Sequence, residues 1–173
     1  MPKNHRNYQK TRHIALSGLL FALAMALSFI EGTLVIPGLL PGMKLGLANI
    51  VTVFALYRLG AGAALAILVT RCLLGGLFAG NLSAMLFSVL GGVTAMLVMI
   101  LLQRLPRLSV YGVSLGGAAA HNVGQMAAAV ITLDSTMVLG YLPFLLAVSL
   151  VTGTLTGFVT ALLLRAAQHI RFR

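Results

Sequence analysis

Six long apolar stretches, separated by short breaks, constrain this chain more than any other feature. Hydrophobic residues make up 60% of its 173 residues, and charged residues only 8%. Soluble domains are typically about 45–50% apolar and about 25% charged, and a chain this small could not bury so much apolar surface in a core. Disordered chains, conversely, have low hydrophobicity. The sequence therefore predicts a protein that crosses a membrane several times.

The apolar stretches predict an all-α membrane protein with six transmembrane helices in a single domain, residues 1–173. A bilayer core of about 30 Å needs about 20 helical residues, and Gly, Pro and Arg mark the breaks. The expected spans are residues 14–30, 45–57, 61–78, 82–102, 109–131 and 137–164. The second span is short, and the sixth is expected to bend or to begin late near Pro143. A structured outer loop is expected at residues 31–44, and basic cytoplasmic tails at 1–13 and 166–173.

The placement of charges predicts how the chain is oriented. It has 12 Lys and Arg but only two acidic residues, Glu31 and Asp134. Ten of the basic residues fall in the tails and in the breaks after the second and fourth spans: Lys3, Arg6, Lys10, Arg12, Arg58, Arg104, Arg107, Arg165, Arg171 and Arg173. Because Lys and Arg are enriched on the cytoplasmic side, both termini are expected there. The net charge of +10 is then a signal of topology, and nucleic acid is not an expected partner.

Polar side chains inside the spans are candidate ligand-binding residues, because ionisable groups are costly in a bilayer and usually functional there. Arg71 lies in the third span, where it could also anchor the outer interface or pair with Glu31. In the fifth span His121 and Gln125 share a helix face, and Asn122 is rotated from them by about 100°. These three residues could alternatively form hydrogen bonds that join helices.

Four more polar residues are expected at the same depth, in the outer half of the bundle: Lys44, Asn49, Glu31 and Asn81. Lys44 could alternatively be an interfacial anchor. Polar groups from several spans at one depth predict a pocket that is open to the outside. Arg71 and Lys44 suit a carboxylate or phosphate, and the surrounding leucines and glycines suit an apolar body. The expected ligand is a small anionic or amphipathic molecule.

Several catalytic motifs are missing from the sequence. It has no P-loop for nucleotide phosphates and no aspartate-rich cluster for Mg²⁺. The single Cys72 cannot form a zinc site or an intramolecular disulfide, and no set of nucleophile, base and acid can be assembled. We therefore expect no enzyme activity, no metal and no cofactor. The chain is expected to bind or pass a small molecule in contact with membrane lipid, with energy supplied by other subunits.

Small residues recur at four-residue spacing in the first span (Gly18, Ala22 and Ala26) and in the sixth (Gly153 and Gly157). Such faces let helices approach closely in lipid. Packing within one bundle is the favoured interpretation for most of them. For Gly153 and Gly157, contact between subunits of an oligomeric permease is the alternative.

Three motifs resemble one bacterial family, over Thr11 to Arg165. They are residues 41–49 (PGMKLGLAN), Arg71 followed by residues 73–75 (LLG), and residues 121–125 (HNVGQ). The family is called heptaprenyl diphosphate synthase component I, or Gx transporter family. The overall plan also resembles the substrate-binding S components of energy-coupling factor transporters, which have six helices and a Pro/Gly loop after the first.

The two resemblances imply different partners in a bacterial cytoplasmic membrane. As an S component, the chain would bind its substrate near the outer face. Its first helix would dock a transmembrane T component through Gly18, Ala22 and Ala26, and two ATPases would supply energy. The synthase name implies instead a non-catalytic membrane subunit associated with the synthesis of heptaprenyl diphosphate, an isoprenoid. We favour the transporter interpretation.

Overall fold

The computed structural model describes residues 3–33 and 46–169, and all regular secondary structure in these residues is helical. The α-helices are α1 (Lys3–Thr33), α2 (Asn49–Arg58), α3 (Ala61–Phe78), α4 (Leu82–Gln103), α5 (Val110–Leu133) and α6 (Leu142–Ala166). Two short 3-10 helices, η1 (Thr136–Tyr141) and η2 (Ala167–His169), precede and follow α6. The predicted all-α class is therefore confirmed for the described residues.

Among the described residues, four segments are long and apolar enough to cross a membrane: Lys10–Thr33, Ala61–Phe78, Leu82–Gln103 and Thr136–Ala166. They identify a multi-pass membrane protein. The ten residues of α2 extend only about 15 Å at 1.5 Å per residue, about half of a bilayer core. The 24-residue α5 is long enough but carries the polar cluster. The expectation of six full spans thus stays a prediction.

The helix boundaries correct two expectations. Because α1 continues to Thr33, Glu31 lies inside the helix and is not the first residue of a loop. The rest of the expected loop, up to Lys44, falls almost entirely outside the described residues. At the other end α1 begins at Lys3, so most of the basic tail is a helical extension. Pro143 lies in the first turn of α6, where proline is tolerated, so the sixth helix does begin late.

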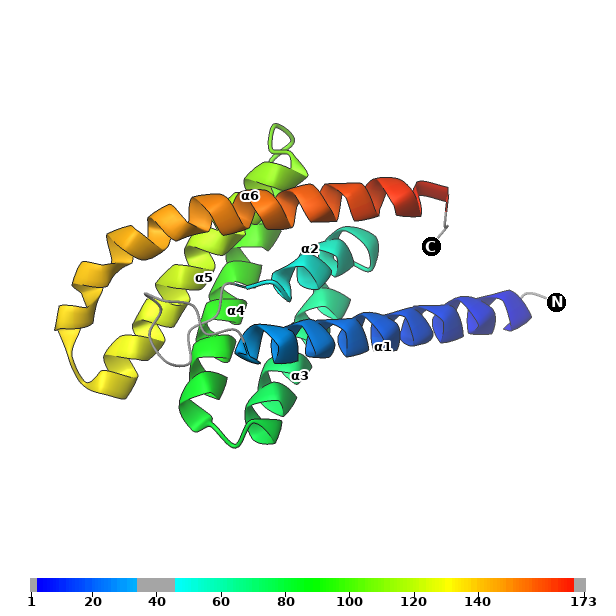
Figure 1. Cartoon of the computed structure of the whole chain (residues 1–173). Helices are drawn as coiled ribbons and strands as arrows, with labels where there is room; N and C mark the ends of the chain where they lie inside the picture. The colour runs from blue at the N-terminus through cyan, green and yellow to red at the C-terminus, as the bar shows by residue number, and fades with distance from the viewer. Residues whose placement is uncertain (1–2, 34–45, 170–173) are drawn as a thin grey trace.

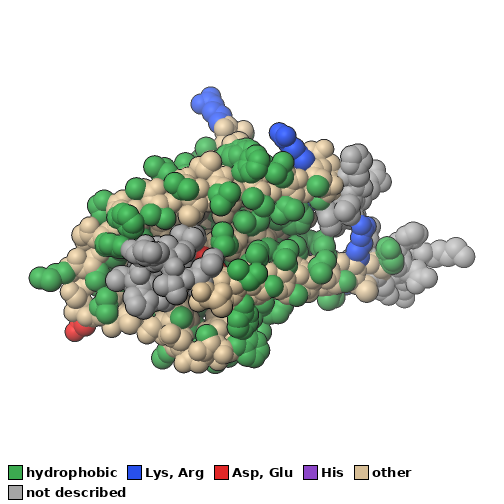
Figure 2. All heavy atoms as spheres, viewed as in Figure 1, with side chains coloured by type: hydrophobic (Ala, Val, Ile, Leu, Met, Phe, Trp, Pro, Cys, Tyr) green, Lys and Arg blue, Asp and Glu red, His purple; other side chains and the backbone are tan. Residues whose placement is uncertain are grey.

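The helices form a bundle in which α4 and α5 pack along most of their lengths (Figure 1). The beginning of α1 and the end of α6 lie at the same end of the bundle. In Figure 2, Lys and Arg side chains project near these two ends and near the α4–α5 turn, and an acidic side chain lies at the opposite edge. Hydrophobic side chains cover the surface between them. The orientation of the chain in the membrane stays a prediction.

Gly153 and Gly157 let α6 lie directly on α5. A Cβ atom at Gly153 would come within 2.8 Å of the Cα atom of Leu115, and one at Gly157 within 3.1 Å of the Cα atom of Tyr111. Any side chain at Gly153 would therefore push the two helices apart. Packing inside one chain, the favoured interpretation, accounts for this pair of glycines.

Candidate functional site

The turn before α2 is tied to the end of α1. Glu31 is buried, and its Oε1 accepts hydrogen bonds from the backbone N–H groups of Gly46 and Leu47, the latter at 3.3 Å. Gly46 has a φ of +88°, a conformation that favours glycine. Its carbonyl oxygen accepts a bond from the backbone N–H of Asn49 at 2.8 Å. The carboxylate of Glu31 therefore holds the turn that leads into α2 against the end of α1.

His121 and Gln125 share one face of α5, as their spacing predicts, and the structure places this face against α4. A Cβ atom at Gly91 of α4 would lie 2.9 Å from Cγ of Gln125 and 3.0 Å from Nδ1 of His121. The imidazole of His121 also lies close to Gly46. A Cβ atom added at Gly46 would be 3.8 Å from Cδ2 of His121. Both side chains are buried. Together with Asn49 and Glu31, they form a polar layer around the Gly46 turn.

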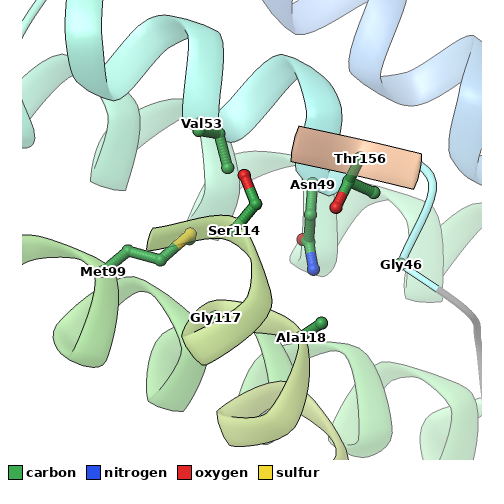
Figure 3. A pocket seen from close by; sticks show the side chains of 8 residues that line it. All are labelled: Gly46, Asn49, Val53, Met99, Ser114, Gly117, Ala118 and Thr156. Carbon is green, nitrogen blue, oxygen red and sulfur yellow. The ribbon is translucent and has the colours of Figure 1, made fainter. Parts of the chain in front are cut away.

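A small cavity lies beside this turn (Figure 3). It is lined by Gly46, Asn49, Val53, Met99, Ser114, Gly117, Ala118 and Thr156. The side chains of Asn49, Ser114 and Thr156 reach toward it from three different helices, α2, α5 and α6. The volume open to the centre of a water molecule is about 10 Å³, which suits about one water. The side chains that line it include no charged group.

Several buried polar atoms in this region have no hydrogen-bond partner among the described residues. They are Oδ1 of Asn49, Oγ of Ser114, and both Oε1 and Nε2 of Gln125. Asn49 is 7% exposed, Ser114 2% and Gln125 0%. Leaving a buried polar group unsatisfied costs about 1–3 kcal/mol. Such a concentration of unsatisfied atoms is expected where a ligand or water completes the hydrogen bonding.

Arg71 is buried between α3 and α1, on another side of the polar layer. Its Nη1 donates to Oγ of Ser28 at 2.7 Å, whereas its Nε has no partner within the part of the chain described. Ser28 precedes Glu31 by one turn of α1. Arg71 does not line the cavity of Figure 3, so the guanidinium and the cavity are separate features of the region.

Other candidate residues have structural roles or lie elsewhere. Nδ2 of Asn122 donates to the backbone oxygen of Leu145 at 2.6 Å and so joins α5 to α6, which is the alternative role considered for it. Asn81 is exposed and caps α4, its Oδ1 accepting from the N–H of Ala84 at 2.9 Å. The structure does not bring Asn81 into the polar layer. Lys44 lies outside the described residues.

Three residues of the region were not singled out from the sequence: Ser28, Ser114 and Thr156. Serine and threonine are common in membrane helices, where they often bond to their own helix backbone. Thr156 does so, donating to the oxygen of Gly153 at 3.0 Å. Nothing in the sequence distinguished Ser28 and Ser114 from such residues, because their relevance depends on contacts between helices.

The stripe of Gly18, Ala22 and Ala26 lies on an exposed face of α1. A Cβ atom at Gly18 would meet nothing within 4 Å. The residues that α1 packs into the bundle, including Leu20, Ala24 and Ser28, are buried. Unlike Gly153 and Gly157, these small residues are not used for packing inside the described part of the chain.

Comparison with known protein families gives one match. The family model described as heptaprenyl diphosphate synthase component I matches residues 20–163. No curated protein and no solved structure gives a match. The matched residues extend from α1 to α6 and include the polar layer, the cavity lining and Arg71. The chain therefore belongs to the heptaprenyl diphosphate synthase component I family.

Proposed function

We propose that the chain is the membrane-embedded, substrate-binding subunit of an ATP-driven importer, similar to an S component. The ligand is small and anionic or amphipathic, and it enters from the outer side of the membrane. It binds in the polar layer around the Gly46 turn, where Asn49, His121 and Gln125 contribute polar groups. Separate T-component and ATPase subunits supply the energy.

The observation that carries this proposal is the set of buried atoms of Asn49, Ser114 and Gln125 that have no hydrogen-bond partner within residues 3–33 and 46–169. Lipid cannot satisfy them, since its hydrocarbon neither donates nor accepts hydrogen bonds. A structural network would pair such groups with one another, as Asn122 is paired with Leu145. The cavity at Asn49 and Ser114 holds about one water, so a larger ligand requires the Gly46 turn to move.

The exposed stripe of α1 supports the partner assignment. Small residues at four-residue spacing form flat faces on which another transmembrane helix can pack closely. Gly18, Ala22 and Ala26 present such a face, and it is open in the monomer. We propose that this face docks the T component.

The family description favours a second candidate, a non-catalytic membrane subunit of heptaprenyl diphosphate synthesis. A first component implies a second, and the chemistry would then belong to that partner. The chain itself has only two carboxylates. Glu31 holds the Gly46 turn, and Asp134 ends α5, so they form no Mg²⁺-binding cluster. In this case the partner is a soluble, aspartate-rich synthase.

Identification of copurifying proteins separates the two candidates. The tagged chain would be purified in mild detergent from the membranes of its own bacterium, as wild type and as Ala22→Trp and Ala26→Trp. Val151→Trp is the matched control, since Val151 is 70% exposed on α6. We expect a membrane T component and ATPases with the wild type and the control, and their loss from both α1 variants. A soluble prenyl synthase in their place would support the second candidate and exclude the first.

A further inference from the structure

The buried guanidinium of Arg71 has no carboxylate bound to it among the described residues. Arg71 is 5% exposed, and a buried cation is strongly unfavourable without an opposite charge. The whole sequence contains only two acidic residues, Glu31 and Asp134. No segment of the chain, including residues 34–45, can therefore bring any other carboxylate to Arg71.

Neither carboxylate serves this purpose. Asp134 is exposed in the turn after α5. Glu31 is used at the Gly46 turn, where its Oε1 accepts two backbone hydrogen bonds. Within residues 3–33 and 46–169 no ion pair joins Glu31 to Arg71, whose hydrogen bond is to the neutral hydroxyl of Ser28. Within the part of the chain that the structure describes, the hydrogen bond that this cation donates goes to one neutral serine hydroxyl.

The geometry of the guanidinium leaves room for an anion. Nη1 is used by Ser28, and Nε is buried without a partner in the described residues. Nε and Nη2 form the edge of arginine that binds a carboxylate or phosphate in bidentate fashion. We propose that Arg71, steadied by Ser28, binds a phosphate or carboxylate group, and that this group supplies the missing negative charge between α1 and α3.

This inference deepens the proposed function, on which it rests, by naming the charged part of the ligand and its position. The anionic group binds at Arg71, apart from the neutral cavity lined by Asn49 and Ser114, whose lining contains no charged side chain. The anion can come from a soluble ligand or from the head group of an anionic lipid.

Thermal unfolding of the purified chain tests the proposal. Loss of helix would be followed by circular dichroism in phosphatidylcholine nanodiscs at constant ionic strength. One arm adds millimolar pyrophosphate or citrate, and the other replaces part of the lipid with phosphatidylglycerol. The variants are Arg71→Met and Arg71→Gln, two changes that remove the buried charge with different packing. Arg107→Gln is the control, because it removes an exposed arginine.

We expect the melting temperature of the wild type to rise by about 3–8 °C in at least one arm, the shift that a near-saturating ligand gives a chain of this size. Arg107→Gln should respond equally, and the Arg71 variants should not respond. A response only to pyrophosphate or citrate identifies a soluble ligand, and a response only to phosphatidylglycerol identifies a lipid. An unchanged response in the Arg71 variants, or no response of the wild type in either arm, would overturn the proposal.

The measurement uses the isolated chain and needs no partner protein. A response that depends on Arg71 would stand even if no T component or ATPase copurified, in which case the importer assignment alone would fail. Conversely, partners could copurify with a chain that shows no response to anions, and then the assignment of Arg71 alone would fail.

Discussion

The carboxylate of Glu31 accepts a hydrogen bond from the backbone N–H of Gly46, 15 residues later in the chain. This bond, with a second from Leu47, fixes the start of α2 against the end of α1. It also positions Asn49, which follows by three residues and lines the cavity. Glu31 therefore holds the start of α2, and with it the candidate site, in position. We call the two hydrogen bonds from Gly46 and Leu47 to Glu31 the Glu31 clamp.

Removal of this clamp should destabilise the bundle. Glu31→Ala leaves two backbone N–H groups without their charged acceptor, and hydrogen bonds to charged groups contribute about 1.5–3 kcal/mol. We expect the melting temperature to fall by about 3–12 °C, at about 2–4 °C per kcal/mol for this chain length. Asp134→Asn removes the other, exposed carboxylate, keeps a residue type that tolerates the φ of +46° at this position, and should change the melting temperature little. Equal shifts in the two variants would show that Glu31 has no special role.

A pair of glycines isolates the contact between the Gly46 turn and Asn49. Gly46 and Gly80 both have a positive φ, +88° and +59°, where alanine costs about 1–2 kcal/mol. At Gly46 the new Cβ atom would also lie 2.8 Å from Nδ2 of Asn49, whereas at Gly80 nothing lies within 4 Å. We expect Gly46→Ala to lower the melting temperature more than Gly80→Ala. Equal effects would contradict the close packing of Asn49 on the turn.

The two stripes of small residues should respond differently to the same substitution. Gly153→Leu places a side chain against the backbone of α5, and overpacking of this kind costs about 1–3 kcal/mol or more. Gly18→Leu points into open space and should leave the melting temperature nearly unchanged. The temperature at which the buried Cys72 thiol becomes accessible to a labelling reagent would report the unfolding of each variant. A large destabilisation by Gly18→Leu would show that α1 packs differently.

Much of the fold could be predicted from the pattern of apolar residues. The helix expected at residues 61–78 has those bounds in the structure, because Gly60 and Gly80 bracket it with positive φ angles. Hydropathy marks where a helix crosses lipid but does not mark where the helix ends. For that reason the polar residues at the start of α1, and Glu31 near its end, were assigned to a tail and a loop.

The candidate site could be predicted only in part. The shared face of His121 and Gln125 follows from the helical period, and so does the different direction of Asn122. Contacts between distant segments do not follow from any local pattern. The bond from Arg71 to Ser28 joins residues 43 apart, and the clamp at Glu31 depends on the positive φ of Gly46. The capping role of Asn81 was predictable, since asparagine is favoured just before a helix.

The hydroxyl of Ser114 should matter for ligand binding and little for folding. Because Oγ has no partner in the described residues, Ser114→Ala removes an unsatisfied buried group and should leave the melting temperature of the empty protein unchanged or slightly raised. Loss of a hydrogen bond to the ligand should weaken binding by about tenfold, or about 1.4 kcal/mol. A clear loss of stability without ligand would indicate that the hydroxyl has a structural partner.

Native mass spectrometry of the chain, purified from the membranes of its source organism, tests most directly whether the bundle captures a small molecule. The wild type would be compared with the double variant Asn49→Leu/Ser114→Ala, which removes both unsatisfied oxygens of the cavity. Thr154→Ala, which removes an exposed hydroxyl, is the control. We expect a bound small molecule on the wild type and on Thr154→Ala, and none on the double variant. A wild-type chain that carries no small molecule, or a double variant that retains it fully, would contradict the proposed function.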